Sequence, residues 1–381
     1  SNAASETERV VTWVTFLKTR ESTVRYGDST INAKVNGYAS KFVDGGPKKR
    51  TMYVHRVFIR NLKPGVSYRY QCGSTDGWSP EYTFVVPRTN EPLTLAVYGD
   101  LGCENAVSLP HLRSETERGN IDAVLHLGDM AYDLHSEDGH VGDKFMRQIE
   151  PIAAYVPYMT AVGNHERKYN YSHYANRFTM VGQSGTVNNL FYSFNLGPAH
   201  IISFSSDHYL RKHKRTEVRN QFHWLEKDLQ VANLPENRSL RPWIITMSHQ
   251  PMYCSNGGKK RDCNSVDSLV RTGLGTRKTY ALEKLFHKYG VDLQLMGHQH
   301  SYERMWPLYN YKVYNEGSLE LYRNPKAPVH IVSGAAGNFE RLKKFPPDRP
   351  QWSAVSIAKY GFSKLRLSNR THIHLEYITT S

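Results

Sequence analysis

Seven side chains able to bind metal ions lie at or just beyond the ends of five short apolar segments. They are Asp100, Asp129, Tyr132, Asn164, His249, His298 and His300. Carboxylate, imidazole, phenolate and amide oxygen ligands together suit hard or borderline cations. Seven ligands exceed the needs of one ion, whereas two ions that share one carboxylate would each have four protein ligands. Two ions about 3.5–4 Å apart bind the attacking and leaving oxygens of an in-line phosphoryl displacement, so the set predicts a two-metal hydrolytic site.

The segments that carry these residues have the length of β-strands and alternate with helix-like segments. The five segments are residues 94–98, 123–127, 158–162, 243–247 and 293–296. Apolar residues recur every three or four positions in residues 142–155, 216–230 and 279–290, which predicts amphipathic helices. This alternation favours an α/β domain with a largely parallel sheet, in which the carboxyl ends of the strands share one edge. We therefore expect the seven ligands to converge at that edge.

The first 90 residues have a different pattern. Short segments rich in Val, Tyr, Phe and Thr, separated by Gly, Pro, Asp and Asn, cover residues 10–16, 22–27, 53–62, 67–73 and 81–87. Such segments predict the strands of a small β-sandwich, and the proline-containing stretch 87–92 predicts a linker. We expect a β-sandwich domain at residues 1–90 and a catalytic α/β domain at residues 91–381.

The composition of the 381 residues excludes several classes of protein. Hydrophobic residues make up 39% and charged residues 22%, as is usual for a folded globular chain. No apolar run approaches the ~18 residues of a membrane-spanning helix, so we expect no membrane span. The net charge of +14 favours anionic partners in general. It does not choose among them, and we expect no specific binding of nucleic acid.

Cysteines and glycosylation triplets favour a secreted or lumenal (endomembrane or lysosomal) protein. Cys254 and Cys263 enclose a polar, glycine-containing loop, which suggests a disulfide, although two free thiols in a cytosolic protein remain the alternative. Cys72 and Cys103 are typical of small buried residues. Three Asn-X-Ser/Thr triplets, which also arise by chance, begin at Asn170, Asn237 and Asn369.

Each short motif that contains these ligands is weak evidence for a metal site by itself. A lone Gly-Asp is a common turn, and His-X-His usually lies in an ordinary loop. Their order is the stronger signal, because each occurs once and each follows an apolar segment. We interpret His111, His126 and His287 as structural or solvent-exposed.

Together, the motifs GDLG, GDMAY, GNHE, SHQPMY and GHQH resemble the five-block signature of metallophosphoesterases. Tyr132 within GDMAY makes the chain similar to the purple acid phosphatases. The extension GHQHSYER and the β-domain resemble the larger, two-domain members found in plants, fungi and animals. The resemblance implies an α/β (α+β layered) catalytic domain, with mixed β-sheets flanked by helices. It also implies that an all-β, fibronectin type III-like sandwich precedes that domain.

The resemblance also implies a role for each ligand. Asp100, Asp129, Tyr132 and His300 would bind Fe(III), and Asp129 would bridge to the second ion. Asn164, His249 and His298 would complete a site for Fe(II), Zn(II) or Mn(II). Small phosphate monoesters would be hydrolysed by attack of a metal-bound hydroxide, and a homodimer is a further expectation. His165, beside Asn164, is the candidate proton donor to the leaving group, with a purely structural histidine as the alternative.

One departure from the family pattern concerns the loop after the His249 segment. Larger members often place histidines there, whereas residues 254–263 contain none. Lys259, Lys260 and Arg261 would bind phosphate instead, or form a solvated loop tip. His208 is a weaker candidate for substrate contact. The basic run 211–215 would steer anions, serve as a processing site, or simply begin a helix.

Three other functions remain open from the residues alone. The first is a phosphodiesterase or nucleotide hydrolase with the same metal centre. The second is a binding or adhesion protein with a degenerate enzyme domain, although all seven ligand positions are filled. The third is a phosphate-sensing protein without turnover.

Overall fold

The computed structural model describes residues 1–2, 5–88, 91–211, 213–256, 263–314 and 320–380. Part of the predicted linker therefore lies outside the described residues, as do Lys259, Lys260, Arg261 and one residue of the basic run. None of the helices in these ranges has the length and apolarity needed to cross a bilayer.

The N-terminal region consists of two antiparallel sheets. Its strands are β1 (Arg9–Thr15), β2 (Thr23–Gly27), β3 (Ala33–Asn36), β4 (Tyr38–Val43), β5 (Thr51–Ile59), β6 (Ser67–Ser74), β7 (Gly77–Trp78) and β8 (Tyr82–Val85). One sheet has the order β1-β5-β4, and the other has the order β3-β2-β6-β7 with β8 also paired to β6. The apolar cluster of this region includes Val24, Val57, Tyr68 and Phe84. The sequence did not predict β3 and β4, because these strands are short and largely exposed and therefore contain few apolar residues in a row.

The catalytic region contains two mixed sheets. The first has the order β11-β10-β9-β21-β22 and the second has the order β12-β13-β14-β15-β19-β16-β20. The first sheet contains β9 (Leu93–Tyr98), β10 (Ala123–His126), β11 (Tyr158–Thr160), β21 (Gly361–Leu367) and β22 (Ile373–Thr379). The second contains β12 (Tyr192–Leu196), β13 (Ala199–Ser203), β14 (Trp243–Met247), β15 (Leu293–Met296), β16 (Tyr302–Met305), β19 (Val329–Ser333) and β20 (Ser353–Ile357). A short ribbon joins β17 (Leu308–Tyr309) to β18 (Lys312–Val313).

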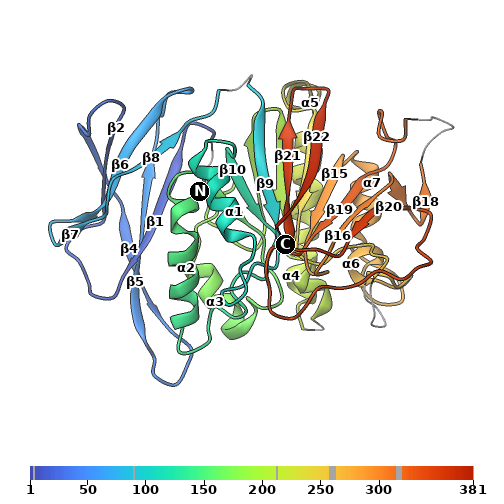
Figure 1. Cartoon of the computed structure of the whole chain (residues 1–381), viewed down its shortest axis with the longest axis horizontal. Coiled ribbons are helices and arrows are strands. Elements are labelled where there is room, and N and C mark those ends of the chain that lie inside the picture. Colours follow the sequence, from blue (N-terminus) through green and yellow to red (C-terminus); the bar gives the residue numbers. More distant parts are fainter. Residues whose placement is uncertain (3–4, 89–90, 212, 257–262, 315–319, 381) are drawn as a thin grey trace.

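Helices cover the outer faces of the two sheets (Figure 1). They are α1 (Leu109–Glu117), α2 (His140–Ala153), α3 (Lys168–Arg177), α4 (Arg215–Ala232), α5 (Pro235–Leu240), α6 (Leu269–Thr272), α7 (Leu282–Lys288) and the 3-10 helix η1 (Asp207–Leu210). The predicted helices correspond to α2, α4 and α7. In α2, Phe145, Ile149 and Ile152 recur at four and three positions and join the core of the sheets.

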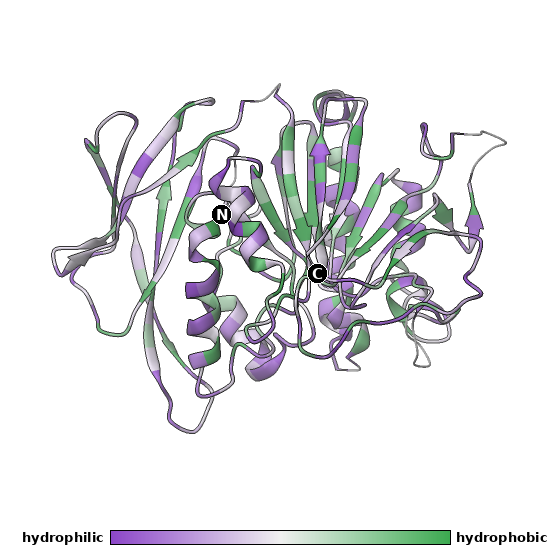
Figure 2. Cartoon of the chain, in the orientation of Figure 1, coloured by the Kyte–Doolittle hydropathy of each residue, from purple (hydrophilic) through white to green (hydrophobic). Residues whose placement is uncertain are grey.

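The strand pattern explains the layering. In β14, Ile245 and Met247 belong to the core between the sheets, whereas Ile244 belongs to the cluster formed with α4 and α7. Successive side chains of a strand point to opposite faces, so a continuous apolar run fills both layers. Figure 2 shows strands β9 and β10 as mainly hydrophobic, while the outer helices carry hydrophilic stretches. The expectation that all five segments lie in one largely parallel sheet is corrected: β9, β10 and β11 belong to one sheet, and β14 and β15 belong to the other. The mixed sheets that the resemblance implies are confirmed.

The N-terminal sheets pack against α2 and α3 (Figure 1). Buried polar contacts cross this interface: Asp44 lies 2.7 Å from Nε2 of His173, and Arg56 donates to Thr179. A cavity of about 660 Å³ lies between the same regions, lined by β1, β6–β8 and α2. It contains none of the seven predicted metal ligands.

His330, in β19, makes the fold sensitive to acid. Its ring packs edge-on against Tyr253 at 4.9 Å, and Nε2 lies 3.3 Å from the carbonyl oxygen of Leu308. Burial lowers the pKa of His330 from 6.5 to about 4. The unfolded chain therefore binds this proton first as the pH falls. The contribution of His330 to the free energy of unfolding is thus constant above pH 6.5 and decreases between pH 6.5 and 4.

We expect His330→Gln to reduce the loss of stability between pH 6.5 and 4 by about 3 kcal/mol. Urea unfolding at a series of pH values measures this slope. His111→Gln, at an exposed position, is the matched control and should leave the slope unchanged. A wild-type slope in the His330 variant would contradict the assignment.

Candidate metal centre

The predicted ligands lie where strands end and the backbone turns sharply. Asp100, Asp129, Tyr132 and His298 all have positive φ angles, between 49° and 67°. Such conformations are costly for residues other than glycine and cluster at functional sites. Gly163 allows a close approach, because a Cβ atom there would lie 2.2 Å from Oδ1 of Asp129. The local backbone is therefore shaped around these side chains.

Three of the ligands form a first cluster. The hydroxyl of Tyr132 donates to Oδ1 of Asp100 at 2.9 Å and lies 3.1 Å from Nε2 of His300. Nε2 of His300 is 3.5 Å from the same Asp100 oxygen. All three side chains are buried. One carboxylate, one phenol and one imidazole thus point at a common place.

The other four form a second cluster around the ring of His249. Its Nε2 lies 3.0 Å from Oδ2 of Asp129, 3.2 Å from Oδ1 of Asn164 and 3.2 Å from Nδ1 of His298. The ligand atoms of Asp129, His249 and His298 all lie within 4.8 Å of one another. This spacing suits the coordination sphere of a single cation.

Hydrogen bonds to the backbone orient these ligands. Nδ1 of His249 lies 2.7 Å from the carbonyl oxygen of Leu127, and Nδ1 of His300 lies 3.0 Å from that of Arg341. These contacts leave Nε2 of each ring directed into its cluster. The second oxygen of Asp100 accepts the backbone N–H of His298 at 2.8 Å. Outer contacts of this kind are typical of metal ligands.

The charges in the clusters also fit cations. Burial opposes ionisation of Asp129, but His249 holds the pKa of that carboxyl well below its usual range. Burial alone would lower the pKa of His249, yet Asp129 and Asp100 raise it to about 10. Burial and the same two carboxylates raise the pKa of Tyr132 well above its ordinary value. The carboxylates thus favour positive charge on His249 and hold the proton on the neutral phenol of Tyr132, and a cation bound among these donors would replace those protons.

His165 stands beside the clusters with a partner that the sequence analysis did not identify. Its Nδ1 lies 2.6 Å from Oδ1 of Asp133, and its side chain is 23% exposed. Its Nε2 lies 3.9 Å from Oδ2 of Asp129 and 3.7 Å from Oε1 of Glu340. Burial lowers the pKa of His165, but Asp133 and Asp129 outweigh it and raise the pKa to about 9. Nε2 therefore lies between a carboxylate of the second cluster and that of Glu340, on a ring that is partly open to solvent.

Glu166 was also missed, although it ends the motif GNHE. Its buried carboxylate accepts the backbone N–H groups of Asp129, Met130 and Gly163, each at 2.9 Å. It thereby ties the loop after β10 to the loop after β11. The signal available in the sequence was an acidic residue directly after Asn164-His165.

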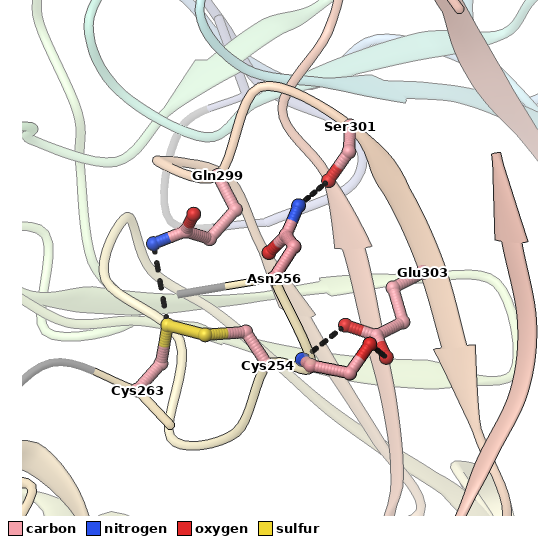
Figure 3. Close-up of a disulfide and its surroundings, with 7 residues drawn as sticks. Cys254, Asn256, Cys263, Gln299, Ser301 and Glu303 are labelled. Atoms are coloured by element: carbon pink, nitrogen blue, oxygen red, sulfur yellow. Dashed lines mark hydrogen bonds between the residues drawn. A yellow bond between two sulfur atoms is a disulfide. The ribbon is translucent and has the colours of Figure 1, made fainter. Parts of the chain in front are cut away.

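The structure joins Cys254 and Cys263 in a disulfide next to the His298–His300 segment (Figure 3). The side chain of Gln299 donates to Sγ of Cys263 at 3.3 Å, and Asn256 donates to Ser301 at 2.8 Å. The described ends of the loop are thus attached to the segment that carries two ligands. Lys259, Lys260 and Arg261 lie outside the described residues.

Other predicted residues lie away from the clusters or are hidden. His208 is 1% exposed, its ring contacts Tyr171, and burial lowers its pKa to about 4. This burial argues against a direct substrate contact. His126 is also buried, with Nδ1 2.7 Å from the hydroxyl of Tyr158, as expected of a structural histidine.

The three glycosylation triplets differ in accessibility. Asn369 is exposed in the turn between β21 and β22. Asn237 is half-buried, and its Nδ2 donates to the carbonyl oxygen of Val231. Asn170 is exposed, and its Oδ1 accepts from Lys214. Asn170 and Asn369 are thus the exposed members of the three.

Comparison with known protein families accounts for most of the chain. The calcineurin-like phosphoesterase family matches residues 93–302, and the N-terminal domain of purple acid phosphatases matches residues 1–86. The C-terminal region of iron/zinc purple acid phosphatase-like proteins matches residues 327–381. The chain belongs to the purple acid phosphatase family. The resemblance seen in the sequence motifs is thus confirmed.

Individual purple acid phosphatases show how close the relationship is. Human acid phosphatase type 7 is 50% identical over 376 residues, which cover 97% of this chain and 84% of that protein. The Fe(3+)-Zn(2+) purple acid phosphatase 12 of Arabidopsis thaliana is 30% identical, over 97% of this chain and 77% of that protein. The solved structure of purple acid phosphatase PPD1 from yellow lupin is 26% identical with a TM-score of 0.81. The match covers all of this chain and 71% of that one.

These matches establish the general fold and the reaction class of the chain. The chain is an acid phosphatase-type hydrolase with a binuclear metal centre and a mixed α/β calcineurin-like fold. A β-rich domain precedes that fold.

Proposed function

We propose that the enzyme hydrolyses phosphate monoesters at two ions held by the two side-chain clusters. Asp100, Tyr132 and His300 would bind the first ion, and Asn164, His249 and His298 the second. Asp129 would bridge them, since it contacts His249 and is near enough to Tyr132 to raise the pKa of the phenol. The observation that carries the proposal is the grouping of seven donors into two such sets.

The donor types support an assignment of the two ions. A phenolate beside two carboxylates is a hard anionic set, which suits Fe(III) in the first site. Two imidazoles and an amide oxygen suit Fe(II), Zn(II) or Mn(II) in the second, as in the Fe(3+)-Zn(2+) relative named above. When bound, such ions lower the pKa of water and neutralise charge on the phosphoryl group.

The chain's own residues would complete the reaction. His165 is partly exposed beside the clusters, with Nε2 3.9 Å from Oδ2 of Asp129, so Nε2 would donate a proton to the leaving oxygen. Asp133 would hold the ring in place through Nδ1. Glu166 would keep the bridging ligand and Asn164 in register by binding both loops.

We expect concentrated, freshly purified enzyme to show a broad visible absorption band, because a Tyr132 phenolate on Fe(III) gives charge transfer. Tyr132→Phe should abolish the band and keep the fold, since only the hydroxyl is removed. Metal analysis provides the control for iron content. Iron-containing enzyme without a band would contradict the assignment of Tyr132. Two divalent ions without iron would retain the two-metal hydrolase and remove Fe(III).

We also infer a domain boundary between residues 90 and 91, a fibronectin type III-like N-terminal sandwich, and a secreted or lumenal location. The two antiparallel sheets support the sandwich, while the disulfide and the exposed Asn369 support the location. A loss of mass after N-glycosidase treatment of protein from a secretory host would test the location. The homodimer remains a prediction, which the molecular mass from analytical ultracentrifugation would test.

A further inference from the structure

A rigid segment, residues 337–343, borders the metal centre. The N–H groups of Gly337 and Asn338 donate to the carbonyl oxygens of Asp100 and Leu101, at 3.1 and 3.0 Å. On the other side, the carbonyl oxygen of Arg341 lies 3.0 Å from Nδ1 of His300. Both ends of the segment are therefore fixed to residues that carry or adjoin metal ligands. The two residues between them, Phe339 and Glu340, are held in place from both sides.

Phe339 is an exposed aromatic side chain at this position. It is 55% exposed and belongs to none of the apolar clusters of the described residues. Its ring contacts the ring of Tyr132, with centroids 5.6 Å apart and planes at 66°. The ring of Tyr132 in turn lies 4.4 Å from that of His165. The ring of Tyr132 therefore links the exposed apolar surface of Phe339 to the proposed proton donor.

Glu340 lies on the opposite side of the same histidine from Asp133. Its Oε1 is 3.7 Å from Nε2 of His165, and its side chain is 45% exposed. A proton donor must come within hydrogen-bond distance of the leaving oxygen. The first atoms of the leaving group would therefore lie next to Nε2 and the carboxylate of Glu340, on the side of the site to which Phe339 belongs through its contact with Tyr132.

We propose that Phe339 and Glu340 select the leaving group, an inference that rests on the proposed monoesterase function. Phe339 offers a surface on which an aryl leaving group packs, and Glu340 repels a second anionic group next to the phosphoryl group. The preferred substrates are monoesters of phenols. Substrates with adjacent phosphates, such as pyrophosphate, are disfavoured because their second anionic group would meet the like charge of Glu340.

The experiment compares Phe339→Ala, Phe339→Leu and Glu340→Gln with phenyl phosphate, glycerol 2-phosphate and pyrophosphate as substrates. Leu240→Ala is the control, because Leu240 is 61% exposed in α5, before β14 and so at the opposite end of that strand from His249. Binding of phenylphosphonate and methylphosphonate by the metal-loaded protein gives a readout without turnover.

We expect Phe339→Ala to lower kcat/KM for phenyl phosphate about five- to tenfold, mainly through KM, because an aromatic pair is lost. The loss with glycerol 2-phosphate should be clearly smaller, and Phe339→Leu should fall between. The preference for phenylphosphonate over methylphosphonate should shrink by the same factor. Glu340→Gln should raise kcat/KM for pyrophosphate about tenfold, and more than for phenyl phosphate.

Equal effects on all substrates would overturn the selective role and would show that the pair acts only through His165. An unchanged phosphonate preference in Phe339→Ala would overturn it as well. Failure of the proposed function looks different: the wild-type metal-loaded enzyme would then hydrolyse none of the monoesters. The phosphonate preference would still decide the role of Phe339 in that case.

Discussion

Asp129→Asn should abolish turnover and remove metal, with kcat/KM falling by more than about a hundredfold. Loss of an outer contact to a ligand already costs about 10–100-fold, so loss of the ligand that joins both clusters should cost more. The substitution keeps the shape of the side chain but removes its charge and replaces one oxygen by a donor. Oδ2 of Asp129 is 3.0 Å from Nε2 of His249, and Oδ1 accepts the N–H of His165 at 2.9 Å. Metal analysis and kinetics on the same preparation measure both effects.

Asp292→Asn is the matched control for this change. Asp292 also accepts a backbone N–H, that of Ile244 at 2.8 Å, and lies outside both clusters. It should retain two ions per chain and most of the activity. Wild-type metal content in Asp129→Asn would rule out a bridging role for Asp129.

His165→Ala should retain both ions and lower the rate about 10²–10⁴-fold for alkyl phosphates. For nitrophenyl phosphate the loss should be much smaller, because that leaving group departs without a proton. The backbone N–H of His165, which binds Asp129, is unaffected by the change. The measurement is the rate for a series of substrates whose leaving groups increase in pKa. The rate of the variant should decrease more steeply with leaving-group pKa than that of the wild type.

Asp133→Asn provides the companion variant. It keeps a side chain that can bind Nδ1 of His165 but removes the charge that raises the pKa of the ring. We expect the rate of this variant to fall most for poor leaving groups, as in His165→Ala, but by a smaller factor. Equal losses for good and poor leaving groups in His165→Ala would show that the residue binds phosphate and donates no proton to the leaving group.

The strands and the ligand types could be predicted from the sequence because their signals are local. Buried strands such as β9, β10 and β14 are short apolar runs, and Asp100, Asp129 and His249 follow them directly. The missed strands β3 and β4 lie at sheet edges, where exposure removes that signal. The apolar pattern along the sequence therefore predicts these buried strands well and exposed edge strands poorly.

The residues around the clusters could not be predicted, because their roles depend on distances across the folded chain. Glu340 approaches His165 although 175 positions separate them in the sequence. His208 illustrates the opposite error, since a histidine shortly after a strand end suggested contact with substrate, but the fold buries it.

The sequence by itself determined the family, the seven donors and their order along the chain, because each is carried by a motif of a few adjacent residues. The tertiary structure alone decided that the donors come from two sheets and separate into two clusters. It also decided that Asp133 and Glu340 face the two nitrogens of His165. The physical reason is that coordination and hydrogen bonding act over a few ångströms in space, and only the packing of both sheets brings distant loops within that range.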